Sequence, residues 1–325
     1  MFGMAMNILR VTVVLAGAAT WSCMAADYPE RPVRVIVPSA PGGGPDVGTR
    51  IVVAELAKQF GKQFVVDNRP GATGVIGLEM IARATPDGYT IGHGNSSTLA
   101  INRSFLPKLP YDPDRDLQSV VLYAAQSNIL AVTPSLPVKS VQELVDYLRK
   151  NPGKLLFASV GNGTSQHLSA ELLKRMTNTQ MLHVPYKGAQ QAITEMIGGQ
   201  VHLMFDNASS IGVHVRAGRV RGLAVSTAKR AQAFPDLPTV AESGVPNFEV
   251  AVWGGLVAPG GVSKTIVNRL NAEANKALAT VSVKEKFAGL GSETAGGTPE
   301  EFAAFLKREI AKWADVIKGA NIKPN

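Results

Sequence analysis

Cysteine is almost absent from this sequence of 325 residues, because only Cys23 is present. Disulfides and cysteine nucleophiles are therefore excluded from the remainder of the chain. There is no His-Glu-x-x-His zinc motif and no Gly-x-Ser-x-Gly elbow, and the five histidines show no close metal-ligand spacing. The glycine-rich segments lack the Gly-Lys-Ser/Thr of a nucleotide loop and the third glycine of a dinucleotide fingerprint. These absences predict a protein that is not an enzyme and holds no metal or cofactor.

Positive charge is in excess but is not concentrated at any point of the chain. The 33 lysine and arginine residues outnumber the 25 acidic residues and give a net charge of +8. No run of five consecutive basic residues occurs, so we expect no nucleic-acid partner. A mildly basic protein is suited to acidic small molecules or to a membrane surface.

Residues 1–26 have the character of a signal peptide rather than of a folded segment. Arg10 precedes the apolar run 11–19, which is too short to cross a membrane as a stable helix, and Ala25-Ala26 offers small residues for cleavage. The alternative is a short membrane anchor. Cys23 is a poor candidate for lipid attachment, because the three residues before it do not match the usual Leu-x-small pattern. We therefore expect export to the periplasm, and no other stretch is a transmembrane candidate.

Short β-branched runs alternate with amphipathic helical segments along the mature chain, which predicts an α/β fold with mainly parallel sheets. The length favours two lobes. We expect lobe I to comprise residues 27–124 plus 254–325 and lobe II to comprise residues 125–253. The crossings between them are assigned to Ser119–Ala125 and Phe248–Val257, and two crossings would form a hinge that opens and closes a cleft.

Helix starts are predicted from capping residues. Asp46 is the expected N-cap of a helix over residues 47–60 that stops at Gly61. Three further starts are expected at capping boxes, namely Ser140/Glu143, Ser282/Glu285 and Thr298/Glu301. After the first crossing we expect a separate strand at Ile129–Thr133.

The segment Pro38–Asp46 is the most informative stretch of the sequence. It follows the apolar run Val33–Val37, contains three consecutive glycines, and leads into a helix. Glycines leave backbone N–H groups uncovered, and a helix N-terminus favours negative charge, so this loop is suited to bind an anionic group. The alternative is a tight strand-to-helix turn without a ligand.

Four loops share the same position, because each leaves the C-terminal end of a predicted strand and enters a helix. They span residues 38–46, 94–98, 159–165 and 185–188. In open α/β sheets the ligand crevice lies at the carboxyl ends of the strands, so we expect two loops from each lobe to converge. Their residues are mostly Gly, Ser, Thr, Asn and Pro, which suits recognition by amides and hydroxyls without a covalent step.

Each of these residues also has an ordinary structural explanation. Thr164 or Ser165 could be a plain helix cap, and His167 a hydrogen-bonded packing residue. Asn95, Ser96 and Ser97 could simply hydrogen-bond within their turn, Tyr186 could pack on the surface, Lys187 could be an exposed charge, and Trp253 could be a core residue. Asp206 could cap its own helix, or it could accept a hydrogen bond from a ligand amine or hydroxyl. Arg69 is the nearest charge partner for a carboxylate, but it could equally be a solvated loop arginine.

Six motifs occur in an order and at a spacing that resemble the Bug family, the substrate-binding proteins of tripartite tricarboxylate transporters, over essentially the whole mature chain. They are Tyr28-Pro29-x-Arg31-Pro32, Val37-Pro38-x-x-Pro41-Gly42-Gly43-x-x-Asp46, Val66-Asp67-Asn68-Arg69-Pro70-Gly71-Ala72, Pro86-Asp87-Gly88-Tyr89-Thr90, Val184-Pro185-Tyr186-Lys187-Gly188 and Met204-Phe205-Asp206-Asn207.

The resemblance implies a type II periplasmic binding protein with two α/β lobes hinged by two crossover strands. In that family a small carboxylate is held by main-chain amides, and two ordered waters bridge it to the first loop. Carried over by position, the implied ligand-binding residues are Ser39, Ala40, Pro41, Gly42, Gly43, Asp46, Asn95, Ser96, Ser97, Gly161, Thr164, Ser165, His167, Tyr186, Lys187 and Asp206. Gly44-Pro45 and Asn95 depart from the usual pattern, which leaves the identity of the acid open.

Three functions remain at this point. The first is capture of a small carboxylate (a dicarboxylate, tricarboxylate, aromatic acid or acidic amino acid) and its delivery to a membrane permease. The second is a ligand sensor whose closed form engages a membrane sensor kinase. The third is an exported enzyme, for which the sequence supplies no nucleophile or metal set. We expect a monomer with no cofactor.

Overall fold

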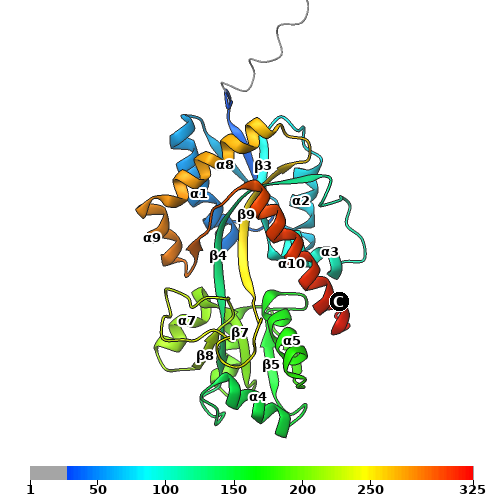
Figure 1. Cartoon of the computed structure of the whole chain (residues 1–325), viewed down its shortest axis with the longest axis vertical. Helices are drawn as coiled ribbons and strands as arrows, with labels where there is room; N and C mark the ends of the chain where they lie inside the picture. Colours follow the sequence, from blue (N-terminus) through cyan, green and yellow to red (C-terminus); the bar gives the residue numbers. More distant parts are fainter. Residues whose placement is uncertain (1–27, 325) are drawn as a thin grey trace, which may run out of the picture.

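The computed structural model describes residues 28–324. The predicted signal peptide, residues 1–26, and Cys23 within it lie outside the described residues. Two lobes are stacked along the long axis of the molecule (Figure 1). Lobe I contains the N-terminal elements together with elements from the C-terminal part of the chain, and lobe II contains the middle of the chain.

One continuous path of strands passes through both lobes, in the order β2-β1-β3-β9-β4-β7-β5-β6, with β8 and β10 paired to β4. The strands are β1 (Val33–Val37), β2 (Phe64–Asn68), β3 (Thr90–Asn95), β4 (Leu117–Val132), β5 (Leu156–Ser159), β6 (Leu182–Pro185), β7 (Leu203–Asn207), β8 (Arg221–Val225), β9 (Ala251–Pro259) and β10 (Glu293–Thr294).

The pairing is parallel within each lobe and antiparallel at the crossing strands. In lobe I, β1 pairs in parallel with β2 and β3, and in lobe II, β5 pairs in parallel with β6 and β7. The long strands β4 and β9 are antiparallel to each other, from Leu117 opposite Pro259 to Ser127 opposite Ala251. The carboxyl ends of the parallel strands of both lobes therefore face the junction between the lobes.

The expectation of two separate strands at 119–125 and 129–133 is wrong, because β4 is a single strand of 16 residues. The polar residues at its middle do not form a turn. Ser127 still pairs with Ala251 of β9, whereas Asn128 pairs with Asn207 of β7. The change of partner between these two positions carries the strand from one lobe into the other without a break.

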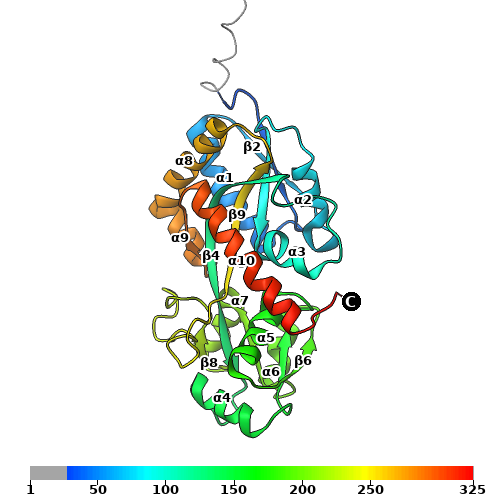
Figure 2. The same cartoon turned by 45° about the vertical axis from the view of Figure 1, so that its right-hand side comes forward.

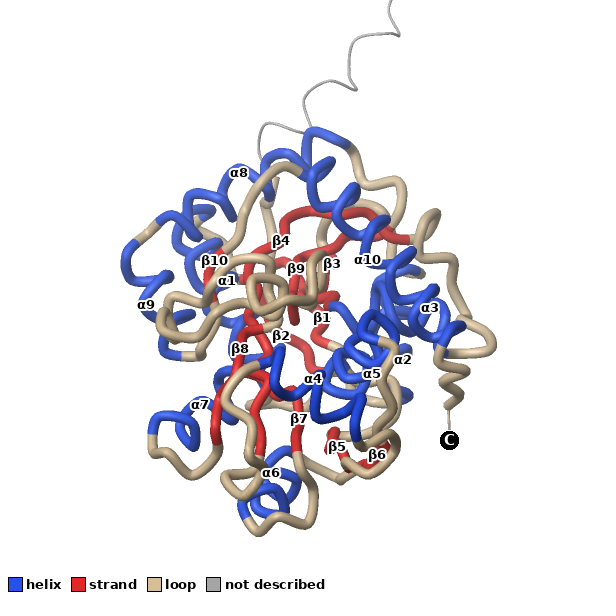
Figure 3. The backbone as a smooth tube through the Cα atoms, turned by 60° about the horizontal axis from the view of Figure 1, so that its bottom comes forward, coloured by secondary structure: helices blue, strands red, loops and turns tan. Residues whose placement is uncertain are grey.

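Helices lie on both sides of the strands (Figure 3). They are α1 (Gly44–Phe60), α2 (Val75–Ala82), α3 (Asn102–Phe105), α4 (Val141–Lys150), α5 (Ser165–Thr177), α6 (Ala189–Ile197), α7 (Ala208–Arg216), α8 (Lys264–Ala279), α9 (Val281–Gly289) and α10 (Pro299–Gly319), with a 3₁₀ turn η1 (Ala72–Gly74) and a π turn η2 (Ser96–Ile101). Between residues 28 and 324, no helix combines the length and the hydropathy that a membrane span requires.

Two of the four predicted helix starts, at Ser140 and Thr298, are confirmed. Thr298 and Glu301 form the expected capping box of α10. Ser140 caps α4, but the Glu143 carboxylate accepts from the amide of Lys139 rather than from that of the cap. The helix predicted to start at Ser282 begins earlier, because Thr280 is its N-cap and accepts from the amide of Val283. Thr280 is also the C-cap of α8.

The hydrophobic core is continuous across the two lobes on one side of the sheet and divided on the other. The continuous cluster runs from Leu78 and Ile81 in lobe I to Leu144 and Leu148 in lobe II. On the opposite side, one cluster is built around α1, α8 and α9, and a separate cluster around α6 and α7. Because apolar burial joins the lobes on one side alone, a cleft between them is expected on the other.

Helix α10 covers the continuous side and runs from lobe I towards lobe II (Figure 2). Near its middle, the buried Glu309 carboxylate accepts hydrogen bonds from the indole nitrogens of Trp253 (3.0 Å) and Trp313 (3.1 Å). Towards its end, Arg175 of α5 donates to the carbonyl of Asp315 at 2.7 Å. The helix is therefore fixed both to the crossing strand β9 and to lobe II.

We predict that Glu309→Ala lowers the free energy of unfolding by about 3 kcal/mol, because it leaves two buried indole N–H groups without an acceptor. Glu300→Ala, in the first turn of the same helix and exposed, is the matched control and is expected to change it by less than about 0.5 kcal/mol. Chemical denaturation followed by tryptophan fluorescence measures both, and equal stability of the two variants would refute the role of Glu309.

Candidate functional site

The first glycine-rich loop is braced by a carboxylate from within helix α1. The prediction that Asp46 is the N-cap is wrong, because the cap is Gly43, and Asp46 lies in the first turn of the helix. Its side chain accepts hydrogen bonds from the amide of Gly42 (2.8 Å), from Arg50 Nε (2.9 Å) and from Asn68 Nδ2 (3.0 Å). Asp46 therefore holds the loop from behind, and one of the glycine amides predicted to face a ligand is already used.

Burial of Asp46 opposes its ionisation, but the hydrogen bonds from Arg50, Gly42 and Asn68 outweigh burial and lower the pKa of the carboxyl. The loop nevertheless keeps donors. Gly43 donates to the carbonyl of Ala40, whereas the amides of Ala40 and Gly44 have no acceptor among residues 28–324. Ala40, Pro41, Gly42 and Gly44 are exposed, so the outer side of this loop is open to a ligand.

The second loop of lobe I, at the end of β3, packs directly on the first. Asn95 caps η2 by accepting from the amide of Thr98 at 3.0 Å, and Thr98 Oγ1 accepts from the amide of Asn95 at 2.9 Å. A Cβ atom placed on Gly74 would lie 2.5 Å from Thr98 Cγ2 and 3.5 Å from Pro38 Cβ. Three loops are thus in contact at the carboxyl ends of β1, β2 and β3.

The side chains of that second loop have different surroundings. Ser96 is buried, Ser97 and Asn95 are half-buried, and Asn95 is occupied in the capping box. Arg69, the proposed charge partner for a carboxylate, instead forms an ion pair with Asp67 at 2.9 Å. Charge neutralisation of a ligand in lobe I would therefore depend on amides and on the N-terminus of α1 rather than on a free guanidinium.

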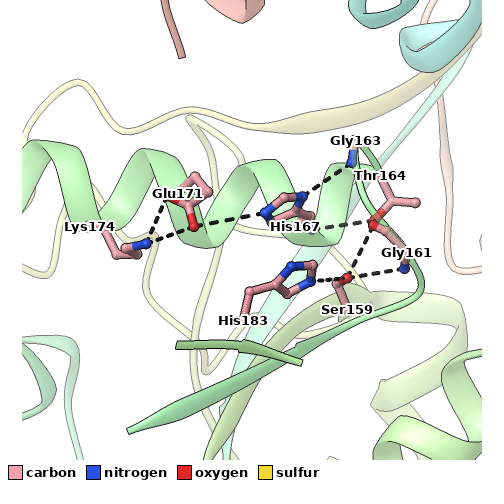
Figure 4. A network of polar contacts seen from close by, with 8 residues as sticks. All are labelled: Ser159, Gly161, Gly163, Thr164, His167, Glu171, Lys174 and His183. Atoms are coloured by element: carbon pink, nitrogen blue, oxygen red, sulfur yellow. Dashed lines mark hydrogen bonds and ion pairs between the residues drawn. The ribbon is translucent and has the colours of Figure 1, made fainter. Parts of the chain in front are cut away.

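In lobe II, two stacked histidines hold the loop 159–165 (Figure 4). The rings of His167 and His183 lie 3.9 Å apart and nearly parallel. His167 Nδ1 accepts from the amide of Gly163 at 3.2 Å, and Ser159 Oγ lies 2.6 Å from Nε2 of His183 while it accepts from the amide of Gly161. These contacts use the Gly161 and Gly163 amides to fix the shape of the loop.

Helix α5 begins at this loop. Thr164 caps it: its Oγ1 accepts from the amide of His167 and donates to the carbonyl of Gly161. The amides of Ser165 and Gln166 have no acceptor among residues 28–324. Thr164 is thus a helix cap and His167 a hydrogen-bonded packing residue. The first two amides of α5 remain as donors for a ligand.

The third polar centre of lobe II is Asp206, at the end of β7. Its Oδ1 accepts from Gln166 Nε2 at 3.1 Å, whereas Oδ2 is buried without a partner. Burial raises the pKa of this carboxyl, and hydrogen bonds oppose the rise in part. The neighbouring side chains Asn128, Asn207 and Ser210 also carry buried polar atoms without partners. This is an unusual concentration of unsatisfied groups beside the crossing strand.

Sequence reasoning missed Gln166 and Asn128. Asn128 ends a short polar stretch, Gln126-Ser127-Asn128, inside an otherwise mostly apolar strand, and this is a detectable signal. Its Nδ2 donates to Ser169 Oγ at 3.3 Å. Tyr186 and Lys187 follow β6 as predicted. The Tyr186 amide donates to the carbonyl of Ser159, the ring packs partly against the α6–α7 core, and the Lys187 side chain is exposed.

One of the predicted ligand loops of lobe II contacts lobe I directly. A Cβ atom on Gly163 would lie 2.9 Å from the ring of Phe105 in α3, so the α5 loop abuts lobe I there. A cavity of about 450 Å³ beside it is lined by Phe105 and by Asn162 of the same loop. A second cavity, of about 900 Å³, lies elsewhere at the junction, and none of the predicted site residues lines either cavity. The structure gathers the loops within each lobe, and their joint contact with one ligand stays a prediction.

Comparison with known proteins decides the family. Residues 49–322 match the family described as "Tripartite tricarboxylate transporter family receptor". The chain belongs to this receptor family. It is 35% identical over 326 residues to Protein BugT of Bordetella pertussis, an alignment that covers 98% of this chain and 100% of that protein. The resemblance to the Bug proteins is therefore confirmed.

Two solved structures show the same two-lobed fold. One, described as "R. palustris Rpa4515 with adipate", has a TM-score of 0.78 and 39% identity, and the alignment covers 92% of this chain and 100% of that chain. MatC (Rpa3494) from Rhodopseudomonas palustris with bound malate has a TM-score of 0.73 and 32% identity, covering 89% and 100%. The family is one of periplasmic receptors that bind small solutes, and this places the chain among binding proteins.

We predict that the His167–His183 stack makes stability depend on pH. Burial, aided by the neighbouring charges, lowers the pKa of His167 from 6.5 to about 3 and that of His183 to about 4. Both groups are neutral in the folded state, so below pH 6.5 the unfolded chain binds more protons, and stability falls as the pH drops from about 6.5 towards 4.

The measurement is the midpoint of urea unfolding at intervals between pH 7 and pH 4. The variant His183→Gln removes one of the two suppressed titrations, so the fall in its midpoint is expected to be shallower than in the wild type. Parallel curves for the two proteins would show that the stacked rings do not control this pH dependence.

Proposed function

We propose that this receptor captures a small carboxylate between its two lobes and delivers it to the membrane permease subunits of a tripartite tricarboxylate transporter. One observation supports this most directly. Helices α1 and α5, one from each lobe, both begin after a parallel strand and present amides without internal acceptors. Two positive helix N-termini at the junction of two lobes are suited to an acid.

The expected ligand class follows from the chemistry of these donors and from the relatives. Adipate and malate, bound by two structurally similar proteins, are both dicarboxylates. In the proposed site one carboxylate contacts the amides of Ala40 and Gly44 in lobe I and those of Ser165 and Gln166 in lobe II, and Ser39, Ser97, Tyr186, Lys187 and Asp206 surround the rest of the molecule. The proposed role is binding, in keeping with a family that is described as a receptor.

We further propose that residues 1–26 direct export to the periplasm, where the mature chain acts as a monomer. Lobe I (27–124 plus 254–325) and lobe II (125–253) would close around the ligand by bending at β4 and β9. The second candidate is a sensing role, in which the closed form engages a sensor kinase. Deletion of the gene distinguishes the two candidates. Loss of solute uptake supports transport, and loss of gene induction with intact uptake supports sensing.

The ligand class is tested by a thermal-shift screen of dicarboxylates, tricarboxylates, aromatic acids and acidic amino acids against neutral sugars and amines. A ligand that binds only the folded state, at a concentration of about a hundred times its Kd, raises the free energy of unfolding by about 2.7 kcal/mol. This produces a clear rise in Tm. We expect at least one acid to give this rise. A rise with sugars or amines and none with acids would refute the proposal.

Main-chain recognition is tested at Ser165, the first residue of α5. Proline is tolerated at this helix position, and Thr164 before it is extended (ψ 159°), so Ser165→Pro deletes one amide donor and keeps the helix. We expect the affinity for the acid selected by the screen to fall tenfold or more, since a hydrogen bond to a charged group contributes about 1.5–3 kcal/mol. Ser165→Ala keeps the amide and should bind within about threefold of the wild type. Equal affinities by calorimetry would show that this amide is not a contact.

A further inference from the structure

The cavity of about 900 Å³ lies at the edge of the junction, away from the proposed ligand loops. Its floor is the crossing strand β4 at Ala125–Ser127. One wall is formed by α8, α9 and residues 291–295 of lobe I, and the other by residues 227–233 of lobe II, after β8. We call this the hinge-edge cavity. Its volume falls within the range of pockets that bind small molecules.

Cationic side chains outnumber anionic ones among the residues that line the hinge-edge cavity. Lys229 and Arg230 belong to the lobe II wall and Lys284 to the lobe I wall, and Glu293 is the single acidic lining residue. Glu293 is already engaged, because its Oε1 accepts from the amide of Gln232 at 2.9 Å. This bond also ties the two walls together at one side of the cavity.

The lysines of the two walls are not neutralised by the protein. Arg230 pairs with Glu242 at 3.0 Å, but Lys229 and Lys284 have no carboxylate within 4.0 Å in the described part of the chain. Two unpaired ammonium groups, one from each lobe, therefore line the same cavity. Like charges placed around a shared hollow raise the local concentration of anions there.

We propose that the hinge-edge cavity is a second binding site, for a small molecule that carries two or more oxyanion groups. One group contacts Lys229 in lobe II, and another contacts Lys284 in lobe I. Because its contacts come from both lobes, the occupant links their positions at the hinge. Its binding is therefore coupled to the movement that encloses a ligand at α1 and α5, and the coupling acts in both directions.

The test is calorimetric titration of citrate into the mature protein. We expect citrate to bind the wild type, and its affinity at this site to fall about tenfold or more in Lys229→Ala/Lys284→Ala, because two charge-assisted contacts are lost. Lys286→Ala is the matched control: it removes the same charge from α9 but does not line the cavity, and it should bind like the wild type.

Two comparisons distinguish this site from the proposed ligand cleft and from general charge. Ser165→Pro should keep citrate binding at the hinge edge even where it abolishes binding at α5. Inorganic phosphate carries one oxyanion group instead of several, so it should bind at least about tenfold more weakly than citrate. Absence of citrate binding, or equal affinity in the wild type and the double-lysine variant, overturns the proposal, as does phosphate binding as tightly as citrate.

Discussion

The structure depends on the antiparallel pairing of β4 with β9. β9 pairs with β3 and β4 in lobe I, whereas β4 continues into lobe II and changes partner between Ser127 and Asn128, from β9 to β7 and β8. Every other strand connects to this pair directly or through intervening strands. In the proposed closing movement, β4 would keep the two lobes joined.

The division of the core favours one direction for the proposed movement. On the side of α10, one apolar cluster runs through both lobes, and Glu309 and Arg175 fix that helix at two levels. On the other side, the apolar clusters are separate. Bending that opens the α10 side would expose buried apolar surface, whereas bending that opens the other side would not. This asymmetry favours movement that opens the side of α1, α6 and α7, whereas α5 packs on the continuous cluster through Leu168 and Leu173.

Much of the fold followed from the sequence because the local signals agree. Strand-to-helix alternation, the stop at Gly61 and the capping box at Thr298 are all local patterns, and each appears in the structure. The errors lie where distant residues decide. Gln126-Ser127-Asn128 looks like a break between strands, and only pairing with β9 and β7 makes it continuous. Thr280 prevailed over Ser282 as a cap because α8 and α9 share one turn.

The candidate site was predictable to a lesser degree. Glycine-rich turns after strands indicate where amides can be exposed, but not which amides remain free after folding. The partners of the Gly42, Gly161 and Gly163 amides are Asp46, Ser159 and His167, and these contacts depend on side-chain positions that no spacing reveals. Asp206 was found from its motif, whereas Gln166, which holds it, lies 40 residues earlier and gave no signal.

The brace formed by Asp46 has a consequence for the rate and strength of capture. With Arg50 and Asn68 gripping the same carboxylate, the turn after β1 keeps its geometry when nothing occupies it. Its conformational entropy was therefore lost when the chain folded and is not lost again at each encounter with a solute. At the proposed site, the ligand would meet a loop that is already ordered, and the rate of loading would be set by diffusion and by the proposed lobe movement.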